Sequence, residues 1–123
     1  MASPWFTTAA LFGGSSVAFG AFGAHGLKSR GIAPEKIASW GTAAHYQLIH
    51  TVALLVIEQA APKNVYAKSL FAAGMVGFSG SIYALVLNPE LKFLGPVTPL
   101  GGVCLIGGWL ALAFGSRGRA IGL

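Results

Sequence analysis

Four long apolar stretches, separated by short polar loops, leave this chain few ways to fold. A helix that crosses the hydrocarbon core of a bilayer, roughly 30 Å thick, needs about 20 predominantly apolar residues. The stretches that approach or exceed this length are Pro4–Leu27, Ala38–Glu58, Ser69–Leu87 and Leu94–Gly115. They predict an all-α, polytopic membrane protein, a bundle of four transmembrane helices that forms one domain over residues 1–123.

The scarcity of charge supports a membrane environment. Charged residues make up 9% of the chain and hydrophobic residues 54%, whereas soluble domains carry about 25% charged residues. The net charge of +5 comes from Lys and Arg residues that lie between or after the apolar stretches, where basic side chains reach lipid headgroups. The lipid bilayer is therefore an expected partner and nucleic acid is not. The basic residues divide equally between the two sides of the predicted topology, so they do not fix its orientation.

Small residues four positions apart recur on three of the four predicted helices. This spacing lets transmembrane helices approach closely. The small faces either close the bundle or, in at least one case, pack against a partner membrane protein or a second copy of the chain. The residues are Ser16, Gly20 and Ala24 in the first stretch, Gly77 and Ser81 in the third, and Gly107, Ala111 and Gly115 in the fourth.

A polar cluster interrupts the second apolar stretch in the sequence WGTAAHYQLIHT. The cluster comprises His45, Tyr46, Gln47 and His50, and Tyr83 in the third stretch is a further polar residue at membrane depth. These five residues are the candidates for ligand binding. They fit either neutral side chains that hydrogen-bond between helices or a site for a proton or a quinone headgroup, because ionisable residues inside a membrane are often functional.

The spacing of the two histidines restricts the chemistry of this cluster. His45 and His50 are five residues apart, which is about 140° around a helix, so they face different neighbours. They cannot form a metal pair on one helix face, which needs a spacing of four. A haem would need facing histidines such as His25 and His45, but His25 is expected to end the first helix with Gly26 as its C-cap. No metal or cofactor is predicted.

Other catalytic patterns are missing from the sequence. The chain has three acidic residues in total, and we find no catalytic triad, nucleotide-binding loop or pair of carboxylates, so no enzymatic activity is expected. Trp40 lies near one edge of the second predicted span, where indole rings often mark the membrane interface.

Four motifs in order along the chain resemble one known family. The stretches GAFGAHGL, WGTAAHYQLIHTVALL, FSGSIYAL and GPVTPLGGVCLIGGWLAL are similar to those of the domain of unknown function 423 family, the transmembrane protein 256-like small membrane proteins. The resemblance implies a four-helix multi-pass protein, located in the inner membrane of mitochondria in a eukaryote or in the inner cell membrane of a bacterium. It implies no settled activity, ligand or catalytic residue.

Two functions are compatible with these observations. The first is a non-enzymatic accessory, assembly or scaffold module that packs against other membrane proteins, because the four spans leave no room for a soluble domain. The alternative is a small transporter or a lipid- or quinone-binding protein with a polar cavity around His45, His50 and Tyr83.

Overall fold

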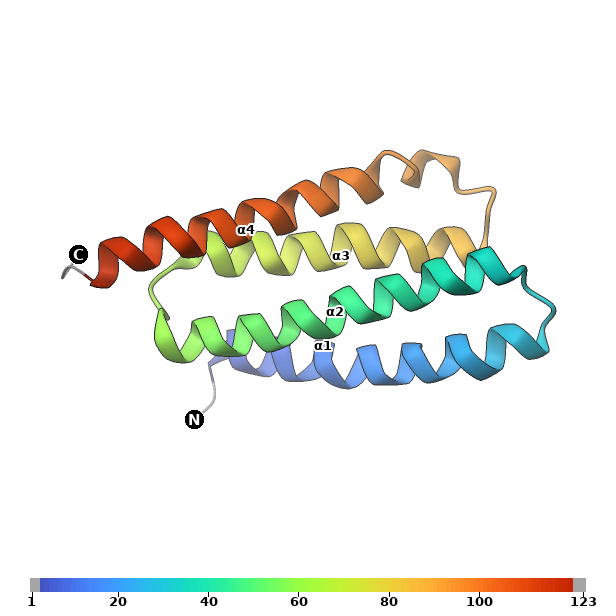
Figure 1. Ribbon diagram of the computed structural model, residues 1–123, viewed down its shortest axis with the longest axis horizontal. Helices are drawn as coiled ribbons and strands as arrows, with labels where there is room; N and C mark the ends of the chain where they lie inside the picture. Colours follow the sequence, from blue (N-terminus) through green and yellow to red (C-terminus); the bar gives the residue numbers. More distant parts are fainter. Residues whose placement is uncertain (1–2, 121–123) are drawn as a thin grey trace.

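The computed structural model of the protein consists of long helices lying side by side and joined by short loops (Figure 1). It describes residues 3–120, and side chains only as far as residue 115. The helices are α1 (Pro4–Ala21), which continues as the π-helical turn η1 (Phe22–Leu27), α2 (Pro34–Ala60), α3 (Val65–Leu87), the short 3-10 helix η2 (Lys92–Leu94) and α4 (Val97–Ala120). The predicted all-α class is confirmed.

Side-chain caps and prolines set the points at which the helices begin. The Ser3 side chain accepts a hydrogen bond from the Phe6 amide at 3.0 Å, and Asn64 does the same for the Ala67 amide at 3.1 Å. These bonds satisfy amides that have no partner within the helix. With Asn64 as its cap, α3 begins four residues before the predicted start. Helix α2 also begins earlier than predicted, at Pro34, because proline suits the first helical position.

The end of the first helix differs from the prediction. Gly26 is not a C-cap, because the chain stays helical through η1 and turns at Gly31, whose φ of 74° is readily adopted by glycine. A π-helical turn contains an extra residue, which rotates the following side chains around the helix axis. Gly23 and Leu27, which continue the line of Ser16 and Gly20 along the helix, are buried, while Ala24, predicted to lie on the packing face, is exposed.

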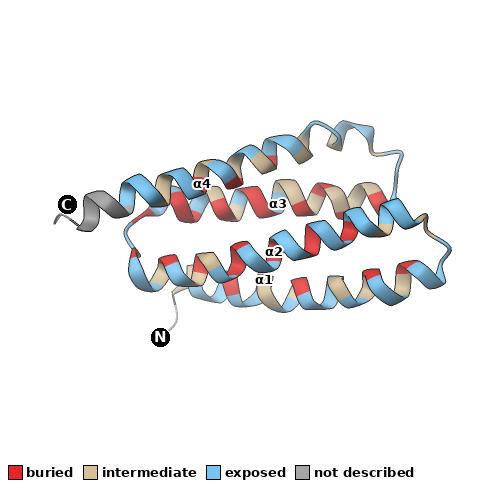
Figure 2. Ribbon diagram, in the orientation of Figure 1, coloured by how far each residue is buried: buried red, intermediate tan, exposed pale blue. Residues whose placement is uncertain are grey.

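Helices that are consecutive in the sequence make the main packing contacts, so α2 and α3 lie between α1 and α4. Figure 2 shows the buried residues concentrated on α2 and α3. One core cluster joins Leu54 on α2, Phe71 and Met75 on α3 and Leu105 on α4. Within the described residues, three helical segments are long and apolar enough to cross a membrane: Pro4–Leu27, Val65–Leu87 and Lys92–Gly115. Helix α2 has sufficient length, at 27 residues, but is not among them.

Glycines bring α3 and α4 together. A Cβ atom at Gly101 would lie 2.2 Å from the Phe78 amide nitrogen, and one at Gly77 would lie 3.2 Å from the Gly101 Cα atom. Nearby, the hydroxyl groups of Ser81 and Thr98 hydrogen-bond to each other. The small-residue faces of these two helices are thus largely used against each other within one chain.

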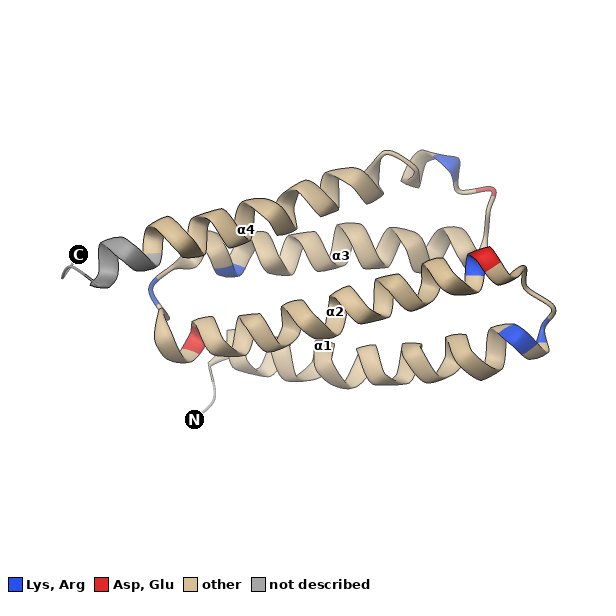
Figure 3. Cartoon of the chain, in the orientation of Figure 1, with Lys and Arg blue, Asp and Glu red and all other residues tan. Residues whose placement is uncertain are grey.

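Charged residues lie at the ends of the helices and leave the middle uncharged, as Figure 3 shows for the described part of the chain. Lys68, expected in a loop, is instead buried in α3 at 4% exposure. Its Nζ atom lies 2.9 Å from Oε1 of Glu58 on α2. The Ser3 hydroxyl donates to the other carboxylate oxygen of Glu58. This ion pair therefore links the beginning of α1, the end of α2 and the beginning of α3.

Candidate functional site

The polar cluster of α2 divides among three sides of the helix. Gln47 is directed toward α1 and α3, His50 is directed toward α3 and α4, and His45 is exposed. The predicted cavity around His45, His50 and Tyr83 is therefore not a single site. The division follows from helix geometry, because Gln47 and His50 lie about 160° and about 140° around the helix from His45 but only about 60° from each other.

Gln47 and Tyr83 form a hydrogen-bonded network near the middle of the helices. The Tyr83 hydroxyl donates to Oε1 of Gln47 at 2.6 Å, and Nε2 of Gln47 donates to the Phe12 carbonyl at 2.8 Å. The Ser79 hydroxyl donates to the Ala43 carbonyl at 2.7 Å. Gln47 is 6% exposed and Ser79 is 1% exposed. These bonds hold α1, α2 and α3 together.

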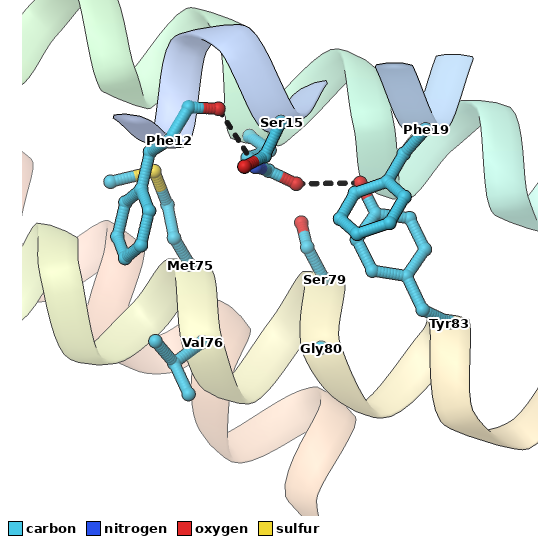
Figure 4. A pocket seen from close by; sticks show the side chains of 9 residues that line it. Phe12, Ser15, Phe19, Met75, Val76, Ser79, Gly80 and Tyr83 are labelled. Atoms are coloured by element: carbon cyan, nitrogen blue, oxygen red, sulfur yellow. Dashed lines mark hydrogen bonds between the residues drawn. The ribbon is translucent and has the colours of Figure 1, made fainter. Parts of the chain in front are cut away.

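A cavity of about 300 Å³ lies beside this network, between α1 and α3. Figure 4 shows the Ser15 and Ser79 side chains pointing toward each other across it, with the rings of Phe19 and Tyr83 close together at one end. The cavity is lined by Phe12, Ser15, Phe19, Gln47, Met75, Val76, Ser79, Gly80 and Tyr83. Its walls are mostly apolar, and its polar atoms belong to uncharged side chains.

Aromatic rings support the Tyr83 end of the cavity. The Trp40 and Phe19 rings each lie 4.6 Å from the Tyr83 ring, and the Trp40 indole N–H donates to the Phe19 carbonyl at 2.6 Å. Trp40 is 1% exposed, so it is a core residue rather than the interfacial ring expected from its position. Gly23 provides the space, since a Cβ atom there would lie 2.4 Å from the indole ring.

His50 is held by both of its ring nitrogens. Its Nε2 atom accepts a hydrogen bond from the Trp109 indole N–H at 3.0 Å. Its Nδ1 atom lies 2.8 Å from the Tyr46 carbonyl oxygen, so Nδ1 carries the proton of the neutral ring. The His50 side chain has no free nitrogen for a ligand in this arrangement. A second hollow, of about 370 Å³, is lined by Tyr46, His50, Pro99, Gly102, Val103, Leu105, Ile106 and Trp109.

His45 and His25 are both exposed, and His45 lines neither of the two hollows. Of the ring contacts of His45, the structure gives only that with neighbouring Tyr46, at 6.3 Å. Gly41, one turn before His45, has open space where a Cβ atom would lie. Among the described residues, no group of three or more His, Cys, Asp and Glu side chains is placed to hold a metal ion.

The predicted packing residues lie mainly between neighbouring helices. Ser16 is buried, and a Cβ atom at Gly20 would lie 4.0 Å from that of Ala44 on α2. On α4, a Cβ atom at Gly107 would contact Leu70 and one at Gly115 would contact Asn64. Asn64 also donates to the carbonyl of Ala111 at 3.1 Å.

The sequence patterns missed three close-packing glycines, Gly23, Gly101 and Gly108. A Cβ atom at Gly108 would lie 2.4 Å from the Phe71 ring. Gly101 and Gly108 are seven residues apart on one face of α4. Each has larger side chains four positions away, Leu105 for Gly101 and Cys104 and Leu112 for Gly108, rather than a regular run of small residues at the spacing of four that predicts a packing face.

Comparison with known proteins adds family matches. A family model described as a protein of unknown function (DUF423) matches residues 19–102. A UPF0382 membrane protein of Schizosaccharomyces pombe is 38% identical over 116 residues, covering 87% of this chain and 96% of the relative. UPF0382 membrane proteins of Staphylococcus aureus (46% identical over 101 residues, covering 79% and 81%) and Haemophilus influenzae (38% over 121 residues, covering 94% and 95%) are also similar. No solved structure matches the chain.

Proposed function

The chain belongs to the DUF423 family of membrane proteins, and we propose that it is a non-enzymatic packing module whose α2 helix docks on a second copy of the chain. The observation that carries this proposal is the outward face of α2. The names of the relatives and the three apolar helices support a multi-pass membrane location of the chain. A mitochondrial location stays a prediction.

The outward face of α2 has the repeat of a helix–helix interface. Ala38, His45 and Val52 are seven residues apart and lie on one line along the helix, and their neighbours complete a continuous exposed stripe. We call this stripe the α2 seam. It consists of Ala38, Gly41, Thr42, His45, Leu48, Ile49, Val52 and Val56. A period of 3.5 residues favours a left-handed pair of helices, the usual crossing in membranes.

One residue of the α2 seam, His45, does not suit contact with lipid tails. His45 lies in the central part of α2, and the structure gives its ring no hydrogen bond to any of the described residues. A polar group without a partner in an apolar medium costs free energy, so ionisable residues within membrane helices usually pair with one another or with other polar groups. Docking on a partner that offers His45 a hydrogen-bonding group would remove this cost.

A second copy of the chain satisfies the requirement of His45 directly. Two copies inserted in the same orientation are related by a two-fold axis along the membrane normal, so the same residue meets itself at the same depth. A neutral imidazole has one donor and one acceptor nitrogen, and two of them can therefore hydrogen-bond across the axis. Gly41 lets the helices approach, and a polar residue on the seam fixes their register.

The small-residue faces support α2 as the docking helix by elimination. The stripes on α3 and α4 were candidates for an external partner, but Gly77 and Gly101 pack against each other. On α1, Ser16 is buried and a Cβ atom at Gly20 would lie 4.0 Å from that of Ala44 on α2, so of this stripe only Ala24 is exposed. The accessory or assembly role expected from these glycines is therefore assigned to the α2 seam instead.

Cysteine crosslinking in native membranes tests the proposal. In a Cys104→Ser background, Ala38→Cys and Val52→Cys should give disulfide-linked dimers on mild oxidation. Val17→Cys is the matched control, because Val17 is 65% exposed on α1. Crosslinking that is as strong at position 17 as at positions 38 and 52, or absent at both seam positions, contradicts a dimer through α2.

A further inference from the structure

We infer that the cavity between α1 and α3 binds a membrane-soluble hydroquinone or phenol, an uncharged aromatic ring that bears hydroxyl groups and carries a hydrocarbon tail. The inference does not depend on dimer formation, because the cavity is lined by α1, α2 and α3 of one chain and lies away from His45. It rests on the position, charge, hydrogen-bonding groups and size of the cavity.

The position of the cavity selects a ligand that dissolves in the bilayer. Its lining residues lie between Phe12 and Phe19 on α1, at Gln47 on α2 and between Met75 and Tyr83 on α3, which places it near the middle of the helices. Phe19 is 38% exposed and Val76 is 62% exposed, so these two side chains border an opening on the outer surface. At this depth the opening faces lipid tails rather than water.

The charge distribution selects an uncharged headgroup. The Lys, Arg, Asp and Glu residues of the described chain lie toward the helix ends (Figure 3), and no charged residue lines the cavity. A phosphate or ammonium group would enter a low-dielectric space without a counter-charge, which is strongly unfavourable. Phospholipid headgroups are therefore excluded as the part of a ligand that occupies this cavity.

The hydrogen-bonding groups of the cavity are complementary to a hydroxyl group. The Ser15, Ser79 and Tyr83 hydroxyls already donate their protons to Leu11, Ala43 and Gln47, respectively. Their oxygen atoms keep lone pairs that can accept.

Gln47 supplies the complementary donor. One N–H bond of its side-chain amide is used by the Phe12 carbonyl, and the structure gives the second N–H no partner among the described residues. Gln47 is more than nine-tenths buried, so this unpaired N–H is costly without a ligand. A ligand hydroxyl can donate its proton to one of these three hydroxyl oxygens and accept from the free N–H of Gln47.

The size and walls of the cavity select a single substituted ring. An apolar cavity of about 150 Å³ accommodates benzene, and this one has about 300 Å³. That volume fits a ring with its substituents and the first part of a tail. The Phe12, Phe19 and Tyr83 rings line the cavity, and aromatic rings pack favourably in offset or edge-to-face arrangements.

Photolabelling of the full chain in proteoliposomes tests this inference. The probe is a photoreactive, short-tailed benzohydroquinone kept reduced with ascorbate, and labelled peptides are identified by mass spectrometry. We expect saturable labelling of the segments 12–19 and 75–83. Gly80→Leu should fill the cavity, because a Cβ atom at Gly80 meets open space, and should reduce labelling at least roughly tenfold. Gly14→Leu is the matched control, an open glycine outside the cavity, and should leave labelling unchanged.

One further variant and one competition experiment test the inference even if Gly80→Leu fails to fold. Ser15→Ala removes one acceptor whose only hydrogen bond to the described residues is within its own helix, and should weaken binding by roughly three- to tenfold. The dimethyl ether of the same ring, which cannot donate, should compete much less well than the hydroquinone. Equal labelling of the Gly80→Leu and Gly14→Leu variants, or equal competition by the ether, a diacylglycerol or a sterol, would overturn the inference.

Discussion

Adding one methyl group at Gly101 should separate α3 from α4. In Gly101→Ala the new Cβ atom would lie 2.2 Å from the Phe78 nitrogen and 2.6 Å from the Gly77 carbonyl carbon. Comfortable contacts between such atoms begin near 3.5 Å, so the helices must move apart by about 1 Å. Overpacking usually costs about 1–3 kcal/mol. We expect a value near 3 kcal/mol, because the obstacle is backbone and cannot rotate away.

Gly102→Ala is the matched control for this prediction. Its Cβ atom would lie 3.6 Å from the Phe78 ring, an ordinary contact, and it gains the same helix propensity of up to about 1 kcal/mol. The difference between the two variants therefore isolates the steric cost.

The assay for the two variants is SDS-induced unfolding in mixed micelles followed by circular dichroism. A difference of less than about 0.5 kcal/mol between the free energies of unfolding of the Gly101→Ala and Gly102→Ala variants is typical of surface substitutions. Such a result would contradict the close packing of α3 against α4 at Gly101.

Three further variants test other contacts. Lys68→Met should lower the midpoint of SDS-induced unfolding because it leaves the Glu58 carboxylate without its cation, and a second change, Glu58→Leu, should restore part of the loss; no loss from the single change would contradict the ion pair. Tyr83→Phe should cost about 1 kcal/mol in the same assay because Oε1 of Gln47 loses its donor, and a stability equal to that of the wild type would argue against this bond. Gly23→Ala should displace the Trp40 indole and change the near-UV circular dichroism spectrum, whereas an unchanged spectrum would show that the ring is not packed against Gly23.

The sequence was most informative where local physics decides the structure. Apolar stretches of sufficient length predicted the helices, and the end of α3 falls at Leu87 as expected, because Asn88-Pro89 cannot continue it. The five-residue spacing of His45 and His50 likewise predicted that they face different neighbours, which the structure shows. Such inferences need only the geometry of one helix.

The side-chain contacts between different helices could not be predicted from the sequence. That Gln47 bonds to Tyr83 and His50 to Trp109 depends on the register and rotation of helices far apart in the chain. The π-helical turn η1 was equally unpredictable, because no proline within Phe22–Leu27 marks it in the sequence. A polar residue such as Lys68 also looks the same in the sequence whether it reaches a headgroup or pairs with Glu58 inside the protein.

Distance measurement between two copies in a bilayer tests the α2 seam most directly. A spin label at Val52→Cys in the Cys104→Ser background should give a single short distance by pulsed electron paramagnetic resonance. That distance is set by helix axes about 8–10 Å apart and the two label arms. A label at Val17→Cys on α1 should give a longer one. A signal from position 52 that shows only the background of randomly dispersed chains would contradict the proposed dimer.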